Sequence, residues 1–368
     1  TYLFKSIIES AGMRCGIIGT TGCIAGKTKL PSHLTTPDPI EMFEILRIMA
    51  DAGVEVVCME VSAHALYLRK LVGVVFEAAA YTNLSQDHLD LHRTMDEYAA
   101  AKKKIFSQCR MGCVNADDER APFMLEGAKC PMLTYSAAGG DAKLKAENVY
   151  LTGEGVHFET VYGAERVQTE LAIPGMFSVY NALGIIAAGL SLGISLEKCA
   201  HALSSAKGVK GRMERVPTDG DYSIIIDYSH KPDALEKVLK TLRPITRGRL
   251  IALFGCGGDR DRGKRPIMGA IAADNADFVI VTSDNPRTEE PMAIIDEIVA
   301  GLKDKQTPYT VICDRIEAIG WAIDNSRPGD VILLAGKGHE DYQVIGHEKH
   351  HMDEREIVAQ FLEERKKS

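Results

Sequence analysis

The sequence predicts an α/β protein with two domains, and three observations carry this prediction. Short apolar runs alternate with helical patterns along the chain, which is typical of mainly parallel sheets covered by helices. The alternation restarts after Gly208-Val209-Lys210-Gly211, a segment whose glycines favour a linker. The length of 368 residues also exceeds that of one ordinary domain. We therefore expect one domain over residues 1–210 and a second, Rossmann-like domain over residues 211–368.

The first half opens with helical spacing and continues with strands and helices in alternation. Apolar residues at Leu3, Phe4, Ile7 and Ile8 predict a helix that is closed by Gly12. Around residues 149–173 the pattern changes to short alternating runs, which favours a small antiparallel insert. The other elements expected in this half are strands at 15–18, 54–61 and 78–82 and helices at 39–49, 95–107 and 179–192.

In the second half, five apolar runs have the length of buried strands. They lie at residues 223–227, 250–255, 278–281, 310–313 and 331–335. Helices fall between them, and the one expected over residues 291–302 places Ile294, Ile295 and Ile298 on one side. An open parallel sheet of this kind binds ligands at the carboxyl ends of its strands.

The composition argues against several classes of function. With 45% hydrophobic and 26% charged residues, the chain is typical of a soluble globular protein. No apolar run reaches the ~20 residues of a membrane helix, no signal peptide is evident, and a net charge of −8 argues against a nucleic-acid surface. The nine scattered cysteines predict reduced thiols, and the close pair Cys109 and Cys113 lacks a second pair for a zinc site. We expect a cytoplasmic monomer that binds neither membranes nor nucleic acid.

Asp284-Asn285-Pro286-Arg287 is the most informative segment of the chain. It lies between the strand expected at 278–281 and the helix expected at 291–302, and therefore at the carboxyl end of a strand. An arginine fork can bind a carboxylate bidentately, and a neighbouring asparagine amide can orient an ammonium group. The segment favours an amino acid as ligand, although Asp, Asn and Pro together also form ordinary turns.

Three further loops of the second half follow apolar runs. Residues 227–233 and 336–340 carry charged and histidine side chains, and residues 255–266 form a glycine-rich junction that contains Arg260 and Arg265. Glycines let backbone N–H groups approach an anion, and the two arginines could bind carboxylate or phosphate. The junction alone fits a structural loop equally well, because its spacing is not the dinucleotide fingerprint. Four such loops at successive strand ends predict one binding cleft.

In the first half, Glu60 ends one strand, His88 follows another, and Lys102 lies on the next helix. A carboxylate and an imidazole at neighbouring strand ends suit Mg²⁺ or Mn²⁺. Taken singly, Glu60 fits a solvated strand end and His88 fits a helix cap or a core hydrogen bond, but together they favour a metal site. The histidine-rich run 347–351 has no partner motif, and we interpret it as a solvated turn.

Together these segments resemble the Mur ligase family of bacterial cell-wall synthesis, over essentially the whole chain and most closely its MurE type. Their order and spacing carry the resemblance, and the matching segments are residues 34–37, 59–64, 82–90, 97–102, 211–214, 227–230, 255–265, 284–287 and 336–340. The resemblance implies that the first domain is an ATPase-like domain built on a central, mainly parallel sheet. In the family, Asp-Asn-Pro-Arg marks the members that add meso-diaminopimelate.

The resemblance implies an ATP-dependent amide ligase of peptidoglycan precursor synthesis that uses Mg²⁺. ATP would phosphorylate the D-glutamate carboxylate of UDP-MurNAc-L-Ala-D-Glu, and the amine of meso-diaminopimelate would then attack the acyl phosphate. Glu60, His88 and Lys102 match catalytic, metal-holding positions, and Lys102 matches the lysine that is carbamylated in the family.

The resemblance also implies which residues bind the substrates. Arg260, Asn285, Arg287, Gly336 and Glu340 match the diaminopimelate site, where Glu340 would bind the distal ammonium group. Asn181, Arg212 and His230 match the nucleotide side. The complete set of substrate-binding matches is Thr35, Thr36, Ser62, Lys70, Arg260, Asp284, Asn285, Pro286, Arg287, Gly336 and Glu340.

The chain departs from the family pattern in a few places. The family has a phosphate loop, Gly-Thr-x-Gly-Lys-Thr, before the first helix, and Gly26-Lys27-Thr28 lacks the strand–loop–helix setting of that loop. Lys70, Leu68 and Ser178 stand where arginine, glutamine and asparagine are common in the family. We expect an amino-terminally truncated ligase, without this loop and the domain that binds uridine diphosphate, and with little or no activity of its own.

Two other functions remain open on the sequence. One is a fragment that binds the amino acid without catalysis, and the other is a ligase of the same fold that adds lysine, a dipeptide or glutamate. The segment 284–287 argues against the other ligases, and calorimetry with meso-diaminopimelate and then ATP would separate the fragment from a ligase.

Overall fold

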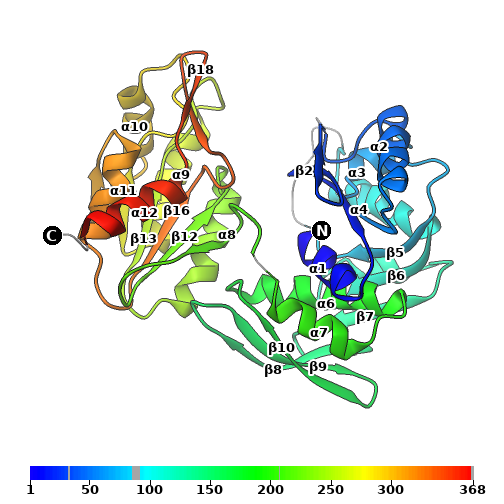
Figure 1. The fold of residues 1–368 in the computed structure, drawn as a ribbon. Helices are drawn as coiled ribbons and strands as arrows, with labels where there is room; N and C mark the ends of the chain where they lie inside the picture. The colour runs from blue at the N-terminus through cyan, green and yellow to red at the C-terminus, as the bar shows by residue number, and fades with distance from the viewer. Residues whose placement is uncertain (32–33, 85–91, 207, 366–368) are drawn as a thin grey trace. The chain divides into compact units, whose positions relative to one another are not determined.

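The computed structural model describes residues 1–31, 34–84, 92–206 and 208–365 (Figure 1). The chain forms two compact units. Unit 1 comprises Thr1–Tyr150, Val156–Ala172 and Met176–Lys207, and unit 2 comprises Leu151–Gly155, Ile173–Gly175 and Gly208–Ser368. In the part of the chain that is described, no helix is both long and apolar enough to span a membrane.

Unit 1 contains a four-stranded sheet in the order β3-β2-β1-β4. β1 pairs in parallel with β4 and antiparallel with β2, so this sheet is mixed. The apolar side chains of α2 and α3 pack on it in one core cluster. The elements are α1 (Tyr2–Ser10), β1 (Cys15–Gly19), β2 (Gly22–Ala25), β3 (Thr28–Leu30), α2 (Pro39–Asp51), β4 (Val56–Met59) and α3 (Ala63–Tyr67).

A second, six-stranded sheet completes unit 1 in the order β10-β9-β8-β7-β6-β5. β5 to β8 pair in parallel, whereas β9 and β10 are antiparallel. The long helix α6 is buried along one side and packs on this sheet. The elements are β5 (Phe76–Tyr81), α4 (Met95–Lys103), η1 (Lys104–Ser107), β6 (Cys109–Asn115), α5 (Ala121–Leu125), β7 (Met132–Ser136), β8 (Leu144–Leu151), β9 (Val156–Tyr162), β10 (Glu165–Leu171), α6 (Met176–Ser191) and α7 (Leu196–Ser204).

The mainly parallel strands expected in unit 1 are confirmed, and they are divided between two sheets. The antiparallel segment expected as a small insert near residues 149–173 is part of a larger sheet, because β8, β9 and β10 continue the six-stranded sheet. Hydrophobic periodicity identifies a strand but does not identify the strand beside which it lies, so the sheet membership could not be predicted.

Unit 2 contains a six-stranded sheet in the order β11-β12-β16-β13-β14-β15. The five strands from β12 to β15 in this order are parallel, and β11 is an antiparallel edge strand. The elements are β11 (Glu214–Val216), β12 (Ser223–Asp227), α8 (Pro232–Leu242), η2 (Arg243–Ile245), β13 (Leu250–Phe254), α9 (Lys264–Asn275), β14 (Phe278–Val281), α10 (Pro291–Val299), β15 (Tyr309–Val311), α11 (Arg315–Asp324), β16 (Val331–Ala335), β17 (Tyr342–Ile345), β18 (Glu348–His351) and α12 (Glu354–Arg365).

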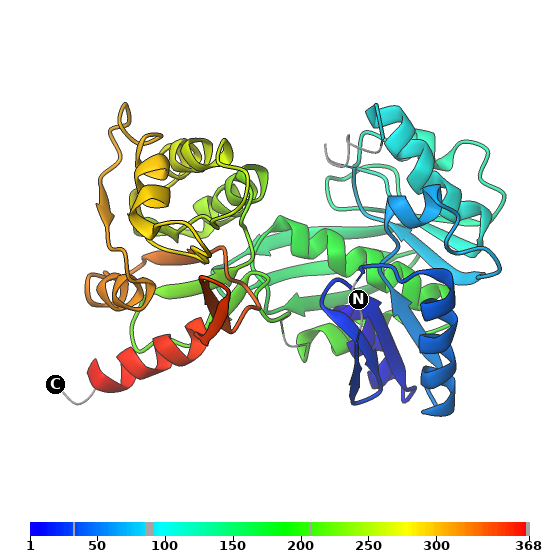
Figure 2. The ribbon, with the colours of Figure 1, turned by 90° about the horizontal axis from the view of Figure 1, so that it is seen from above.

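Helices cover both faces of the unit 2 sheet. α11 and α12 pack on one face through a core cluster that includes Ile319, Ile323 and Val358. α8 and α9 cover the other face (Figure 2). The central strands β13 and β16 are buried along their whole length, which explains why they form continuous apolar runs in the sequence.

Two smaller expectations for unit 2 also changed. Gly211, expected in a linker, is buried, and an added Cβ there would lie 2.0 Å from the backbone nitrogen of His339. The histidine-rich run 347–351 is not a simple turn, because Glu348–His351 forms the exposed strand β18 of a hairpin with β17.

Candidate functional site

The strand order of unit 2 places four polar loops side by side. The loops after β12, β16, β13 and β14 follow neighbouring strands of the sheet. Because these strands are parallel, their carboxyl ends meet at one edge. The sequence-predicted residues Arg260, Gly336 and Glu340 and the segment Asp284-Asn285-Pro286-Arg287 all lie in these loops.

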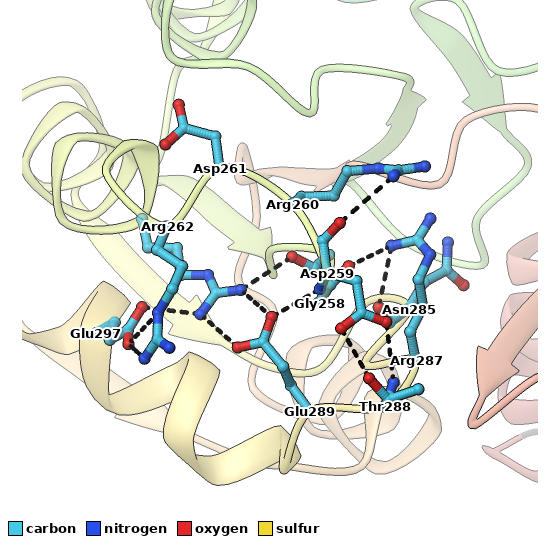
Figure 3. A network of polar contacts seen from close by, with 12 residues as sticks. Gly258, Asp259, Arg260, Asp261, Arg262, Asn285, Arg287, Thr288, Glu289 and Glu297 are labelled. Carbon is cyan, nitrogen blue, oxygen red and sulfur yellow. Dashed lines mark hydrogen bonds and ion pairs between the residues drawn. The ribbon is translucent and has the colours of Figure 1, made fainter.

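Arg260 and Arg287 come from different loops, and their side chains extend to the same side (Figure 3). The Arg287 Nη1 donates to the Gly258 carbonyl oxygen at 2.8 Å and to the Asn285 carbonyl oxygen at 3.5 Å. Its Nη2 and Nε bind no protein acceptor among the described residues. Arg260 is exposed, and its Nη1 lies 3.4 Å from the Asp259 carbonyl oxygen. Two guanidinium groups with spare donors favour an anion at this place.

Asn285 and Glu340 contact each other across the β14 and β16 loops. The Asn285 Nδ2 donates to Glu340 Oε2 at 2.9 Å. The Asn285 Oδ1 accepts from the backbone nitrogen of Val344 at 2.9 Å and from Lys337 Nζ at 2.7 Å. Asn285 is buried, and Glu340 is 15% exposed at its side chain. The site therefore offers an amide and a carboxylate beside the two arginines.

The backbone of the segment 284–287 is held in an unusual conformation. Arg287 has φ of 53°, in the left-handed region that a non-glycine residue seldom adopts. Its backbone pairs with β17, because its nitrogen donates to the Val344 oxygen at 3.0 Å and its oxygen accepts from Gly346 at 2.8 Å. Such conformations occur where the surrounding structure holds them, often at functional sites.

Two glycines allow the loops to approach one another. A Cβ at Gly336, where φ is +115°, would lie 2.6 Å from Asp284 Oδ2. A Cβ at Gly258 would lie 1.9 Å from the Pro286 carbonyl oxygen. The Gly258 nitrogen donates to the Asn285 oxygen at 2.9 Å. The glycine-rich junction thus packs directly against the segment 284–287.

Gly258→Ala is expected to lower the free energy of unfolding of unit 2 by about 1–3 kcal/mol, because backbone atoms must move apart to admit the methyl group. Trp321, the single tryptophan of the chain, lies in α11 and reports on unit 2 by fluorescence during urea unfolding. The matched control is Gly263→Ala in the same loop, where the nearest atom to an added Cβ is Asp261 Oδ1 at 3.2 Å. Equal unfolding midpoints for the two variants would contradict the expectation.

A polar network behind the arginines ties the same two loops together (Figure 3). The Thr288 hydroxyl donates to Asp259 Oδ1 at 2.8 Å, and the Asp259 nitrogen donates to Glu289 Oε1 at 2.6 Å. Arg265 is completely buried and pairs with Glu289 at 2.7 Å and with Glu297 at 2.8 Å. The expectation that Arg265 binds an anionic ligand is therefore wrong, since two carboxylates of the protein occupy its guanidinium group.

Unit 2 is expected to lose stability in acid because of Glu289. Its hydrogen bond with Arg265, and then that from the Asp259 N–H, lower the pKa of Glu289 from 4.5 to about 2. A depressed pKa contributes stability that is present above the unfolded value and is lost as the pH falls towards about 2. Urea unfolding of the native chain, followed by Trp321 fluorescence between pH 5 and 2, should show this loss. Glu289→Gln should make the free energy of unfolding depend less on pH in this range. An unchanged dependence on pH would contradict the assignment of this loss to Glu289.

A buried ion pair supports the two strand ends that carry the site. Arg315 and Glu354 both have fully buried side chains and lie 2.7 Å apart. Arg315 also donates to the Ser283 oxygen at 3.4 Å and to the Ala335 oxygen at 2.9 Å. Burial raises the pKa of the Glu354 carboxyl, and attraction to Arg315 opposes this rise. The pair connects the starts of α11 and α12 to the residues just before Asp284 and Gly336.

Aromatic and histidine side chains form a cluster at the loop after β12. The Tyr228 ring lies 4.5 Å from that of His230 and 4.8 Å from that of His339. The exposed Arg212 lies 5.2 Å from the centroid of the Tyr228 ring. Burial lowers the pKa of both His230 and His339. Two of the predicted nucleotide-side residues, Arg212 and His230, thus lie against the same tyrosine.

In unit 1, Glu60 follows β4 and lies among hydroxyl groups. Thr20 donates to Glu60 Oε2 through its hydroxyl at 2.7 Å and through its backbone nitrogen at 3.2 Å. The hydroxyl of Thr35 lies 3.0 Å from that of Thr20. Carboxylate and hydroxyl oxygens are donors of the kind that Mg²⁺ accepts, so the residues fit such an ion. The described residues, which do not include His88, contain no group of three or more His, Cys, Asp or Glu side chains that could hold a metal, so Glu60 is not joined there by further ligands of these types.

The remaining predicted residues of unit 1 lie in different surroundings. Thr36 is buried, and its hydroxyl donates to the Glu60 carbonyl oxygen at 2.9 Å and accepts from the Ser62 nitrogen at 3.0 Å. Lys70 pairs with Asp38 at 2.6 Å. Lys102 Nζ lies 5.3 Å from the centroid of the Tyr98 ring on α4. Asn181 is exposed on α6. His88 lies outside the described residues.

Three residues that the contacts make important are not among those predicted from the sequence. Thr20 binds Glu60, Lys337 binds Asn285 and Glu340, and Arg315 binds Glu354. Lys337 was visible as part of the segment 336–340 that follows an apolar strand. Arg315 gave no signal, because arginine is a surface residue in most proteins.

Comparison with known proteins identifies the family to which the chain belongs. Residues 1–189 match the Mur ligase middle domain, and residues 211–338 match the Mur ligase glutamate ligase domain. The chain belongs to the Mur ligase family and is an ATP-dependent ligase of that family.

Its relatives include the UDP-N-acetylmuramoyl-L-alanyl-D-glutamate–2,6-diaminopimelate ligases of several bacteria. Ligase 1 of Clostridium acetobutylicum is 44% identical over 366 residues, which is 99% of this chain and 75% of the relative. The Caldanaerobacter subterraneus ligase is 44% identical over 100% of this chain and 76% of the relative.

Solved structures agree with this placement. A structure of a ligase with the same enzyme name is 35% identical, with a TM-score of 0.75, and the match covers 99% of this chain and 75% of that one. The UDP-N-acetylmuramate–alanine ligase of Thermotoga maritima, at 17% identity and a TM-score of 0.64, covers 100% of this chain and 72% of that one and shares the fold.

Proposed function

We propose that this ligase joins meso-diaminopimelate to UDP-MurNAc-L-Ala-D-Glu in peptidoglycan precursor synthesis. The observation that carries the proposal is that Asn285 contacts Glu340 through its side-chain amide and Arg287 through its backbone oxygen, with Arg260 on the same side as Arg287. The relatives named as 2,6-diaminopimelate ligases support the same substrate.

The far end of meso-diaminopimelate carries a carboxylate and an ammonium group. Arg287 and Arg260 would bind the carboxylate through charge-assisted hydrogen bonds, and the Glu340 carboxylate would bind the ammonium group. Asp284, Pro286 and Gly336 would shape the site through the backbone, since Gly336 leaves room for the Asp284 carboxylate. This binding would leave the second amine of the ligand for reaction.

We infer that the reaction passes through an acyl phosphate. Transfer of the γ-phosphoryl group of ATP to the D-glutamate carboxylate breaks its bond to ADP, and attack by the amine then releases phosphate. Mg²⁺ supplies charge neutralisation on the phosphates. Glu60, His88 and a carbamylated Lys102 would hold this ion, because carbamylation replaces an ammonium group with a carboxylate-like ligand.

The other predicted residues complete the proposal. Thr35, Thr36, Ser62 and Lys70 would bind or position the UDP-MurNAc part. Asn181, Arg212 and His230 would bind the nucleotide. A monomeric state and a cytoplasmic location stay predictions.

Calorimetry with the unmodified 368-residue chain tests the proposed substrate. We expect meso-diaminopimelate to bind with at least about tenfold higher affinity than L-lysine, which lacks the second carboxylate, because a charge-assisted hydrogen bond contributes about 1.5–3 kcal/mol. The titrations are made with and without ADP, Mg²⁺ and UDP-MurNAc-L-Ala-D-Glu, so that they also detect binding that requires the other substrates to be present first. Equal affinity for the two amino acids, or binding of neither under any condition, would refute the proposed specificity.

A further inference from the structure

Lys337 is a lysine without solvent exposure at the centre of the candidate site. Its side chain is 0% exposed and follows directly after Gly336 at the end of β16. The ammonium group donates to Asn285 Oδ1 at 2.7 Å and to Glu340 Oε2 at 3.1 Å. Asn285 Nδ2 donates to the same Glu340 oxygen at 2.9 Å. The three side chains thus form a closed triangle, which we call the Lys337 triad.

The triad fixes which way the Asn285 amide faces. Lys337 Nζ and the Val344 nitrogen are both donors, and both lie within hydrogen-bond distance of the same Asn285 atom. Only the amide oxygen can accept these bonds, so the amide NH₂ must face Glu340. Without Lys337, one of the two anchors of this orientation is lost.

The triad also fixes the Glu340 carboxylate. A buried ammonium group requires an anionic partner, and Glu340 is the carboxylate in contact with Lys337. Both side-chain hydrogen bonds of Glu340 use Oε2, and Oε1 has no protein donor among the described residues. One oxygen of the carboxylate is therefore held by the protein, and the other is open to a ligand.

We infer that Lys337 is a positioning residue for the amino-acid substrate. It holds the Asn285 amide and one oxygen of Glu340, so that the second oxygen of Glu340 can accept from the distal ammonium group of a diamino acid. This role rests on the proposed function, because it requires that Glu340 binds the ligand. The Lys337 side chain has no exposed surface, and it acts through these two side chains.

A double-mutant cycle in the full 368-residue chain tests this role, with the affinity for meso-diaminopimelate measured by calorimetry. Lys337→Met is expected to weaken binding at least tenfold, and Glu340→Gln by a similar factor. Because both changes disable the same contact, the double variant should bind no more than about threefold more weakly than Glu340→Gln alone. A purely structural role of Lys337 would instead multiply the two losses.

Two controls make the result decisive. Lys349→Met removes an exposed lysine whose Nζ lies 4.0 Å from the centroid of the Tyr342 ring, the ring that Lys337 also faces at 5.5 Å, and it should leave affinity unchanged. Trp321 fluorescence shows whether each variant folds. If Lys337→Met does not fold, the affinity of the double variant Lys337→Met/Glu340→Gln, which removes both charges, is compared with the affinity of Glu340→Gln alone. The same limit of about threefold weaker binding then applies.

The outcomes separate this inference from the proposed function. Failure of the unmodified chain to bind meso-diaminopimelate under any substrate condition would refute the proposed function, and with it this role of Lys337. Binding by the unmodified chain together with binding by folded Lys337→Met within about twofold would overturn the Lys337 role alone. Multiplied losses in the double variant would do the same.

Discussion

Arg287→Ala is expected to weaken binding of meso-diaminopimelate by about 10- to 100-fold. The substitution removes charge-assisted hydrogen bonds to a carboxylate, each of which contributes about 1.5–3 kcal/mol, and each 1.4 kcal/mol corresponds to a factor of ten. Calorimetry on the chain measures the loss. Arg287→Lys should recover part of it, because lysine keeps the charge and loses the fork that binds both carboxylate oxygens.

The Arg287 variant should also lose its preference for meso-diaminopimelate over L-lysine, since lysine has no second carboxylate. The matched control is Arg247→Ala, which removes an exposed arginine that precedes β13 and therefore lies at the opposite edge of the same sheet. The control should keep both affinity and preference. A preference that survives in Arg287→Ala would remove this residue from the binding site.

Arg315→Leu is expected to lower the free energy of unfolding of unit 2 by about 3–5 kcal/mol, because it leaves the buried Glu354 carboxylate without its partner. The double variant Arg315→Leu/Glu354→Leu removes both charges and should recover much of the loss. Urea unfolding followed by Trp321 fluorescence measures all three proteins, and Trp321 lies on the same helix as Arg315. A double variant as unstable as Arg315→Leu would contradict this account.

The double variant also tests whether the Arg315–Glu354 pair holds the loops of the binding site in position. Arg315 binds the backbone oxygens of Ser283 and Ala335, the residues directly before Asp284 and Gly336. In a folded Arg315→Leu/Glu354→Leu protein, affinity for meso-diaminopimelate should fall while the unit remains intact. Unchanged affinity would show that the loops hold their positions without this pair.

The sequence predicted the strands of unit 2 almost to the residue. Ser223–Asp227, Phe278–Val281 and Val331–Ala335 agree with the expected ranges, because strands buried on both faces are continuous apolar runs. The meeting of Asn285, Arg287 and Glu340 followed from their places at carboxyl ends of parallel strands. In unit 1 the strands were predictable and their division between two sheets was not.

The errors concern side chains whose surroundings come from distant parts of the chain. Arg265 lies in a glycine-rich junction that suggested an anion site, but its partners Glu289 and Glu297 are 24 and 32 positions away. Lys337 and Arg315 are buried cations, and burial of a cation depends on a partner that local sequence does not reveal. Gly211 was expected in a linker and instead packs against the loop that contains His339.

The central claim is that the loops after the parallel strands of unit 2 form the binding site for meso-diaminopimelate. A crystal structure of this chain with that amino acid tests it most directly. We expect one ligand carboxylate against the Arg287 guanidinium group and the adjacent ammonium group against Glu340. A ligand bound with full occupancy elsewhere, with Arg287 and Glu340 untouched, would contradict the claim.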